Sequence, residues 1–311
     1  MDFISPNKLL KVKPDTLRYV RKLFNVDKPG SMKEAVRILN DWTQKQPHLN
    51  KKDFSNRFLE VVILLGKGSI ERAKAQLDKI CTMRTLFPEL FQVFNTKIDS
   101  LDLFEHCQCV LLPELTDEHY RVYVAKFYDS EEDILTRFYR YNISVAEYAM
   151  AHDYFCGFIT IIDVSECNLM NYLRKMDLIQ FKNFMTINTK GYGTRIKAIH
   201  FISESKVVDS LVSLFKHMLS AKVASRIQVH KSLEELYKFI PKAILPKDYG
   251  GKERSLKTLQ EEWIDALSTE EHLSYLKRME AATTNETCRQ KDQFSEQYAG
   301  MSGTFRFLSV D

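Results

Sequence analysis

The chain has 311 residues, of which 44% are apolar and 28% are charged, a balance typical of a globular protein with a large core. Its net charge of +4 argues against bulk binding to nucleic acid but leaves room for a local basic patch. No stretch approaches the ~18 apolar residues of a membrane-spanning helix, and the first residues do not form a secretion signal. The six cysteines have no framework spacing, so we expect reduced thiols and a cytoplasmic protein.

The first hundred residues are expected to form a small bundle of helices. Val36, Leu39 and Trp42 lie about one turn apart, a spacing that indicates a helix with one buried face. Asp53 and Ser69 precede two further apolar runs and are expected to be their N-caps. Helices are therefore predicted over residues 33–46, 54–65 and 70–82.

The pattern changes from residue 108 onward, where short β-rich runs appear. Strands are predicted at residues 109–112, 121–128, 158–164, 195–203 and 226–229. Helices are predicted between the later strands and after them, at residues 131–152, 169–188, 207–221, 232–240 and 255–279. Such alternation implies right-handed crossovers and a mostly parallel sheet, so we expect an α/β fold after the helical bundle.

Two glycine motifs match phosphate-binding loops only in part. Gly66-Lys67-Gly68-Ser69 lacks the required earlier glycine and joins two predicted helices instead of following a strand. Gly191-Tyr192-Gly193 precedes a strand, so its amides are not placed at the start of a helix. We interpret the first motif as a helix stop followed by a new cap, and the second as a turn.

Metal binding and catalysis find little support in the sequence. His106, Cys107 and Cys109 offer three ligands within four residues, but no second Cys/His pair lies at a supporting distance. Asp163 ends a predicted strand, where a lone carboxylate more often caps a turn than acts in catalysis. His200 lies in an apolar strand and is expected to be a hydrogen-bonded core histidine. Because no nucleophile elbow or cofactor motif occurs, we expect no enzyme, no metal and no cofactor.

The segment 207–219 is the most informative apolar stretch. A core helix would have this composition, and that remains one interpretation. Basic residues flank the segment, with Arg195 and Lys197 before it and Lys222 and Arg226 after it. This arrangement also suits a surface that meets anionic lipid while its apolar side enters the membrane interface.

Three blocks of this region resemble the CRAL-TRIO lipid-binding family. They are residues 195–204, residues 222–230 and the segment 244–251, whose Leu-Pro-x-x-Tyr-Gly-Gly is the most specific signal. The resemblance covers residues 30–275 approximately. It is closest to the branch of tocopherol transfer and retinaldehyde-binding proteins, in the form that insects carry.

The resemblance implies a fold, a set of domains and a function. The expected domains are a helical domain at residues 1–97, an α/β lipid-binding domain with a mostly parallel sheet and a mobile helical gate at residues 98–280, and a C-terminal tail at residues 281–311. The implied function is that of a carrier for one small hydrophobic ligand of the tocopherol, retinoid or carotenoid class. Delivery would occur during transient peripheral contact with an anionic membrane.

By position, the resemblance places the gate over residues 205–219. Tyr141, Ser144 and Tyr148 would supply the few polar atoms of the pocket, with Ser144 as the foremost partner of a ligand hydroxyl or carbonyl. The expected apolar contacts are Phe158, Thr160, Ile162, Met176, Phe184, Ile187, Ile199, Phe201, Val208, Leu211, Val212 and Phe215.

The four flanking basic residues match the cleft with which the tocopherol branch binds phosphoinositide head groups. Arg suits phosphate by its planar fork and Lys as a point charge. The arginine-rich run of the family's first bundle is missing, because Val61-Val-Ile-Leu-Leu-Gly66 stands in its place. The alternative functions are a phosphoinositide-binding membrane adaptor and a phospholipid transfer protein. The residues expected to bind phosphoinositide are Arg195, Lys197, Lys222 and Arg226.

Overall fold

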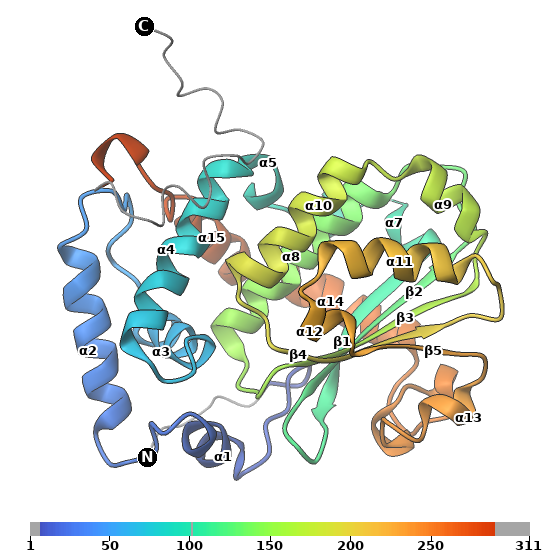
Figure 1. Cartoon of the computed structure of the whole chain (residues 1–311), viewed down its shortest axis with the longest axis horizontal. Helices are drawn as coiled ribbons and strands as arrows, with labels where there is room; N and C mark the ends of the chain where they lie inside the picture. The colour runs from blue at the N-terminus through green and yellow to red at the C-terminus, as the bar shows by residue number, and fades with distance from the viewer. Residues whose placement is uncertain (1–6, 101, 290–311) are drawn as a thin grey trace, which may run out of the picture.

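The computed structural model describes residues 7–100 and 102–289 and places a helical region beside an α/β region (Figure 1). The N-terminal helices lie at one end of the central sheet, and long crossover helices cover the sheet in front (Figure 1). The expected α/β fold with a mostly parallel sheet is confirmed. Within the described ranges, no helix is both long and apolar enough to cross a membrane.

The N-terminal helices form where they were predicted, except that one of them has a different N-cap residue. Ser55 caps the helix that was expected to start after Asp53, because the Ser55 Oγ accepts a hydrogen bond from the Phe58 amide at 3.1 Å. Asp53 instead forms an ion pair with Lys51 at 2.8 Å. Ser69 caps the following helix, as predicted. The helices are α1 (Thr16–Leu23), α2 (Ser31–Gln44), α3 (Asn56–Leu65), α4 (Ile70–Leu86), α5 (Pro88–Phe91), α6 (Thr96–Asp99) and α7 (Leu103–His106).

The central sheet has five strands in the order β1-β2-β3-β4-β5. β1 and β2 are antiparallel, as a hairpin allows, and the other neighbouring pairs are parallel. Tyr123, Thr160 and Ile199 lie side by side in register across three adjacent strands. The strands are β1 (Cys107–Leu115), β2 (Arg121–Tyr128), β3 (Phe158–Glu166), β4 (Ile196–Ile202) and β5 (Ile227–His230).

The crossover helices cover one face of this sheet. The helix predicted over 169–188 is broken, because Asp177 accepts hydrogen bonds from the Ile179 and Gln180 amides at 2.8 and 3.1 Å and thereby caps a new helix. The elements are α8 (Leu135–His152), α9 (Leu169–Lys175), α10 (Leu178–Thr186), the π-helix η1 (Ile187–Gly191), α11 (Val208–Met218) and α12 (Ala221–Ala224).

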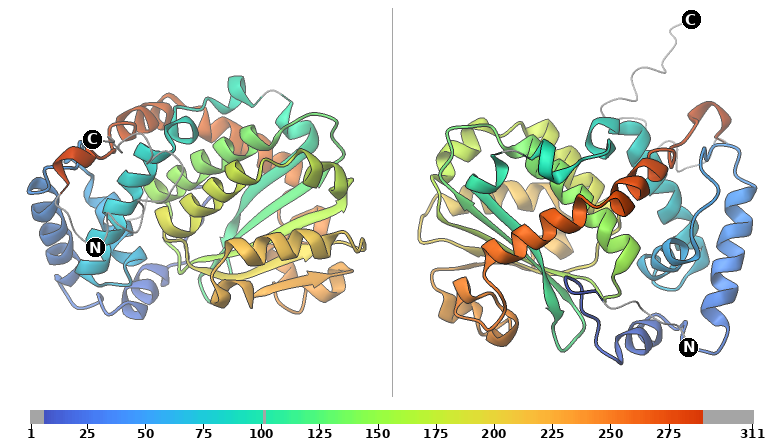
Figure 2. Two further views of the ribbon diagram at one scale, coloured as in Figure 1. Left: turned by 45° about the horizontal axis from the view of Figure 1, so that its top comes forward. Right: turned by 180° about the vertical axis from the view of Figure 1, so that it is seen from behind.

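The C-terminal elements, seen from behind in Figure 2, cover the other side of the molecule. The helix predicted over 255–279 forms as two helices, because Thr269 caps a second one through the His272 amide at 3.3 Å. Trp263 donates to the Leu111 carbonyl at 3.1 Å and ties the first of these helices to β1. The elements are α13 (Leu233–Leu236), η2 (Lys242–Ile244), η3 (Lys247–Tyr249), α14 (Leu256–Leu267), α15 (Glu270–Met279) and η4 (Glu286–Cys288).

The Leu-Pro-x-x-Tyr-Gly-Gly block fastens this side to the sheet. Tyr249 donates a hydrogen bond to Asp163 Oδ2 at 2.9 Å, within β3. A side chain at Gly251 would begin 1.8 Å from the Leu245 carbonyl oxygen, so only glycine allows the chain to pass here. The block therefore has an architectural role on the face opposite the crossover helices.

The last described residues pack against the N-terminal helices. Leu49 and Thr284 form an isolated β-bridge, and Arg289 forms an ion pair with Asp78 at 2.6 Å. Asp78 also contacts His48 Nε2 at 2.7 Å. The tail predicted from residue 281 therefore begins with a segment attached to the bundle, while its part from residue 290 onward lies outside the described residues.

Candidate functional site

A cavity of about 220 Å³ lies between the sheet and the crossover helices. Protein interiors contain few voids larger than a single water molecule, which needs only about 10–15 Å³ by this kind of measure. The cavity is therefore far larger than a packing defect, and its walls decide what can fill it.

One wall is a strip of the sheet. Phe158, Thr160, Ile162 and Val164 are the alternate residues of β3 that face the cavity. At a rise of about 3.3 Å per residue, these four positions extend over about 20 Å. β2 and β4 add further side chains on either side, so the wall is long and narrow.

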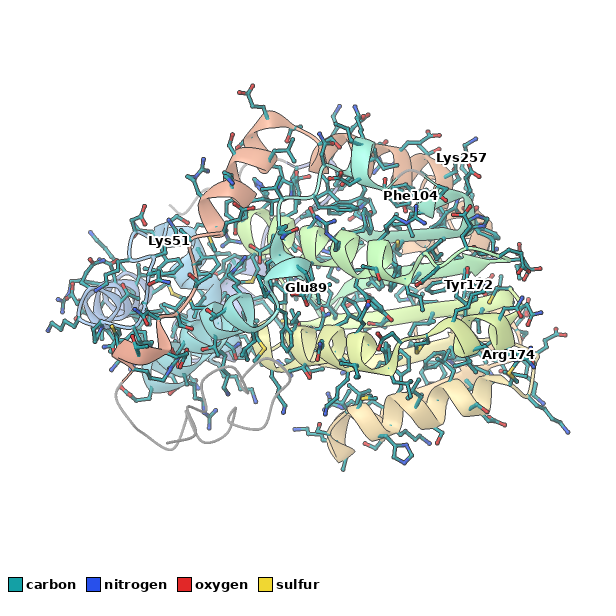
Figure 3. The ribbon with its side chains drawn as sticks, turned by 90° about the horizontal axis from the view of Figure 1, so that it is seen from above. Lys51, Glu89, Phe104, Tyr172, Arg174 and Lys257 are labelled. Atoms are coloured by element: carbon teal, nitrogen blue, oxygen red, sulfur yellow. The ribbon has the colours of Figure 1, made fainter. Side chains whose placement is uncertain are left out.

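The opposite wall comes from α8, α9, α10, the π-helix and α11. Tyr172 lies on α9 at the end of the molecule far from the N-terminal helices (Figure 3). Its Oη donates to the Tyr128 carbonyl at 2.8 Å, so the ring closes that end of the cavity while its hydroxyl is already used. Met176, between α9 and α10, also lines the cavity. The helical residues that line the cavity are Leu135, Phe138, Tyr139, Asn142, Val145, Ala146, Leu169, Tyr172, Phe181, Phe184, Met185, Asn188, Thr189, Leu211 and Phe215.

Helix α11 closes the cavity with two apolar side chains. Phe215 meets the Phe201 ring edge-on at 5.3 Å and packs against Phe181 at 5.2 Å. Leu211 also lines the cavity, while the outward positions such as Ser213 and Lys216 are exposed. α11 is thus an amphipathic cover that is held to the sheet mainly by apolar packing.

The lining contains no Asp, Glu, Lys or Arg among the described residues. Its best-defined polar feature is a pair from β2 and α8, in which Tyr123 Oη donates to Asn142 Oδ1. Asn142 Nδ2 in turn donates to the Phe138 carbonyl at 2.7 Å. Burial, together with the neighbouring thiols of Cys109 and Cys107, raises the pKa of Tyr123 well above its usual value, so its hydroxyl stays protonated.

The structure brings together eight of the residues expected to contact a ligand. These cavity-lining residues are Phe158, Thr160, Ile162, Met176, Phe184, Ile199, Leu211 and Phe215. Ile187, Val208 and Val212 are buried but do not line the cavity, and Phe201 lies under α11 against Phe215. A ligand-binding role for all of these residues stays a prediction.

The three expected polar contacts lie on the other face of α8. Tyr141 donates to the Cys109 carbonyl at 2.8 Å, Ser144 Oγ lies 3.1 Å from His272 Nε2, and Tyr148 accepts from Asn7 at 3.1 Å. Helical periodicity explains the difference, because residues 138, 142, 145 and 146 share one face and residues 141, 144 and 148 share the other. Both faces are buried, so periodicity alone did not show which one borders a cavity.

Sequence reasoning missed Tyr123 and Asn142. A signal for Tyr123 exists in the alternation of β2, where its side chain lies on the same face as Ala125 and Phe127. Asn142 carries no such signal, since a polar residue within an apolar helix gives no indication of what it contacts.

The four basic residues gather at the starts of β4 and β5. The Arg195 guanidinium lies 5.7 Å from the Tyr120 ring, and Lys197 Nζ pairs with Glu118 at 2.8 Å on the surface. Arg226 donates to the Ile196 carbonyl, and Lys222 is exposed on α12. They form a basic surface group outside the cavity, and exposed pairs such as Lys197–Glu118 contribute little to stability.

The remaining reactive side chains of residues 7–100 and 102–289 lie in separate pairs. No group of three or more His, Cys, Asp or Glu able to hold a metal occurs in the described part of the chain. Cys107 and Cys109 lie side by side with their sulfur atoms 3.8 Å apart. His200 Nδ1 and His230 Nε2 are 2.8 Å apart on the face opposite the cavity, and burial lowers the pKa of His200 to about 4. Both histidines are therefore neutral near pH 7.

Comparisons with known proteins agree with this architecture. Residues 105–251 match the family model of the CRAL/TRIO domain. Proteins called alpha-tocopherol transfer protein-like, from Homo sapiens and Mus musculus, are 36% identical to this chain over 78 residues. That alignment covers 25% of this chain and only 23% of each relative. A solved structure described as "Crystal structure of Sfh5" covers 87% of this chain and 99% of its own with a TM-score of 0.52 at 15% identity, a likeness in fold alone.

Proposed function

We propose that this chain, whose residues 105–251 match the CRAL/TRIO domain, carries one small hydrophobic ligand and delivers it at membranes. The observation that carries the proposal is the long apolar cavity whose described lining contains no charged side chain. Such a lining favours a neutral, mostly apolar molecule, because an enclosed unpaired charge is costly. We propose that its contacts are Phe158, Thr160, Ile162, Ile199, Met176, Phe184, Leu211 and Phe215, of which all but Thr160 are apolar.

The dimensions of the cavity support the tocopherol or retinoid class within this proposal. A wall about 20 Å long can enclose a single isoprenoid chain with one ring. A full carotenoid is much longer and would have to extend past the cover formed by α11. The alpha-tocopherol transfer protein-like relatives support the same class, although the match spans only a quarter of their length.

The experiment is extraction of the purified protein with organic solvent, followed by mass spectrometry and an absorption spectrum. We expect one neutral isoprenoid lipid per chain. Ala146 lines the cavity on α8, whereas Ala151 on the same helix does not, so Ala146→Phe and Ala151→Phe form a matched pair. We expect Ala146→Phe to reduce loading at least tenfold because it fills the cavity, and Ala151→Phe to leave it unchanged. Equal loading of both variants would contradict the proposal.

A second function, phosphoinositide-dependent membrane binding, is favoured by the basic surface group. We propose that Arg195, Lys197, Lys222 and Arg226 hold an anionic head group outside the cavity while α11 contacts the membrane. Sedimentation with phosphoinositide-containing vesicles should weaken with salt and with the double change Arg195→Ala/Lys197→Ala. Lys33→Ala/Lys45→Ala removes one exposed charge on α2 and one at the residue directly after it, and is the control. If both double variants bind equally, the basic group is not the membrane site.

A further inference from the structure

The cavity offers its polar atoms at very few places. Several polar side chains of the lining are already satisfied by the backbone: Asn188 donates to the Phe184 carbonyl at 2.9 Å and Thr189 to the Met185 carbonyl at 2.7 Å. Tyr172 likewise donates to a backbone carbonyl. A ligand gains little from groups that have their partners, so these residues act mainly as walls.

Tyr123 and Asn142 are different because they satisfy each other only in part. Tyr123 Oη uses its proton on Asn142 Oδ1 and keeps lone pairs that can accept. Asn142 has one amide N–H on the Phe138 carbonyl, and its second N–H has no acceptor among the described residues. Both side chains line the cavity, so a donor and an acceptor remain there for a ligand.

Thr160 adds a hydroxyl next to this pair. It lies directly opposite Tyr123 in the β2–β3 register, where neighbouring strands are about 4.8 Å apart. Its Oγ1 has no hydrogen-bond partner among the described residues, and it faces the cavity. Three polar side chains from two strands and one helix therefore converge on one part of an otherwise apolar wall.

We propose that Tyr123, Asn142 and Thr160 bind a single uncharged oxygen of the ligand, a hydroxyl or a carbonyl, and so select a neutral lipid with one polar group. The inference rests on the proposed carrier function. A carboxylate or phosphate at this position would meet no cation, since the described lining has none, and a pure hydrocarbon would leave the polar trio without a partner.

Thr194 also lines the cavity, and its hydroxyl has no hydrogen-bond partner among the described residues. The other rival polar group is Tyr139. Its hydroxyl is buried without a partner, and its ring stacks on Phe184 at 4.6 Å. Burial, with the carboxylates of Asp133 and Asp177, raises its pKa above the usual value. These carboxylates belong to the N-terminal ends of α8 and α10, so the Tyr139 hydroxyl lies within electrostatic reach of the starts of these two helices.

The test uses three probes with one carbon skeleton: phytol, its hydrocarbon phytane and its acid phytanic acid. Loading from neutral vesicles at pH 8 is measured by native mass spectrometry. We expect the unchanged protein to prefer phytol about threefold to tenfold over phytane, as one net hydrogen bond implies, and at least tenfold over phytanic acid. Tyr123→Phe and Thr160→Val should each reduce the preference for phytol over phytane, with phytane loading unchanged.

Two further variants keep the test decisive. Tyr172→Phe removes a hydroxyl from the same cavity that is already bonded to the backbone, and it should leave the preference intact. Tyr123→Phe/Asn142→Leu removes both partners together, so no buried atom is left unpaired and the fold is preserved.

The outcomes separate this inference from the carrier function. Loading of phytol, phytane and phytanic acid to equal extents would overturn the polar subsite and leave the carrier function standing. A loss of preference in Tyr139→Phe but not in Tyr123→Phe would also overturn the subsite. Failure of the unchanged protein to load any of the three probes or α-tocopherol would overturn the carrier function itself.

Discussion

The two buried faces of helix α8 use polar side chains in opposite ways. On the face away from the cavity, Tyr141, Ser144 and Glu147 each contact a side chain from another element. On the cavity face, Asn142 keeps an amide N–H without an acceptor and the Tyr139 hydroxyl has no partner. Residue type does not distinguish the two faces, because both contain polar side chains. A polar side chain that has a hydrogen-bond partner in the protein stabilises the fold, whereas one without a partner is a candidate for binding the ligand.

Removal of the buried ion pair on the face of α8 away from the cavity should destabilise the protein most. Glu147 and Arg84 are both almost fully buried and lie 2.5 Å apart, and Tyr275 also donates to Glu147 at 3.2 Å. Glu147→Leu leaves Arg84 as a buried unpaired charge, so we expect a loss of about 3–5 kcal/mol in the free energy of unfolding. Urea denaturation measures it.

The matched control is the exposed pair formed by Glu34 and Arg37 at 2.6 Å on α2. Glu34→Leu should leave the free energy of unfolding nearly unchanged, because both side chains of this pair are exposed to solvent. If Glu147→Leu changed the free energy of unfolding as little as Glu34→Leu, the polar side chains on the face of α8 away from the cavity would not be the ones that stabilise the fold.

Acid should weaken the far face before the cavity face, because His272 lies there. Burial, followed by the charge of His152, lowers the pKa of His272 to about 4. The unfolded chain binds a proton at His272 below about pH 6.5 and the folded chain does not, so this contribution is complete above that pH and is lost as the pH falls toward 4. Stability should therefore decrease between pH 7.5 and pH 5.

The variant His272→Asn should reduce that decrease by on the order of 1–2 kcal/mol, as measured by urea denaturation at the two pH values. The exposed His217 provides the control, and His217→Asn should leave the decrease unchanged. An unchanged decrease in His272→Asn would show that this histidine does not set the acid sensitivity.

The smallest expected effect concerns Ser144, the residue that the sequence favoured as the ligand's partner. Its Oγ faces His272 at 3.1 Å, so Ser144→Ala should cost about 1 kcal/mol of stability. The preference for phytol over phytane should be unchanged, because Ser144 does not line the cavity. A loss of preference as large as that in Tyr123→Phe would place Ser144 at the ligand and contradict the assignment of the two faces of α8.

Most of the fold could be predicted because local patterns determine it. The strand Arg121–Tyr128 and the end of α8 at His152 were predicted at the residues where they occur. Two helix breaks were not predicted, because the apolar periodicity continues through both of them. Asp177 and Thr269 each cap a new helix inside these runs.

The candidate site was predictable only for side chains whose direction follows from the strand. Phe158, Thr160 and Ile162 alternate toward the cavity in any β-strand of this register. The polar groups of α8 were not predictable, because the choice between its two faces depends on α14 and α15, which pack on it from far along the chain. The partner of Asn142 likewise comes from a different strand, so only the tertiary structure brings Tyr123 to it.

The ion pair between Asp78 and Arg289 joins residues that are 211 positions apart in the chain. Asp78 and its neighbour His48 are synthesised early, while Arg289 emerges only after the whole sheet has been made. Closure of so large a loop is slow and depends on prior assembly of the intervening structure. We therefore expect the helical region to begin folding first and to form its ion pair with Arg289 last. Until that ion pair has formed, a nascent or truncated chain should be most susceptible to proteolysis in the helical region.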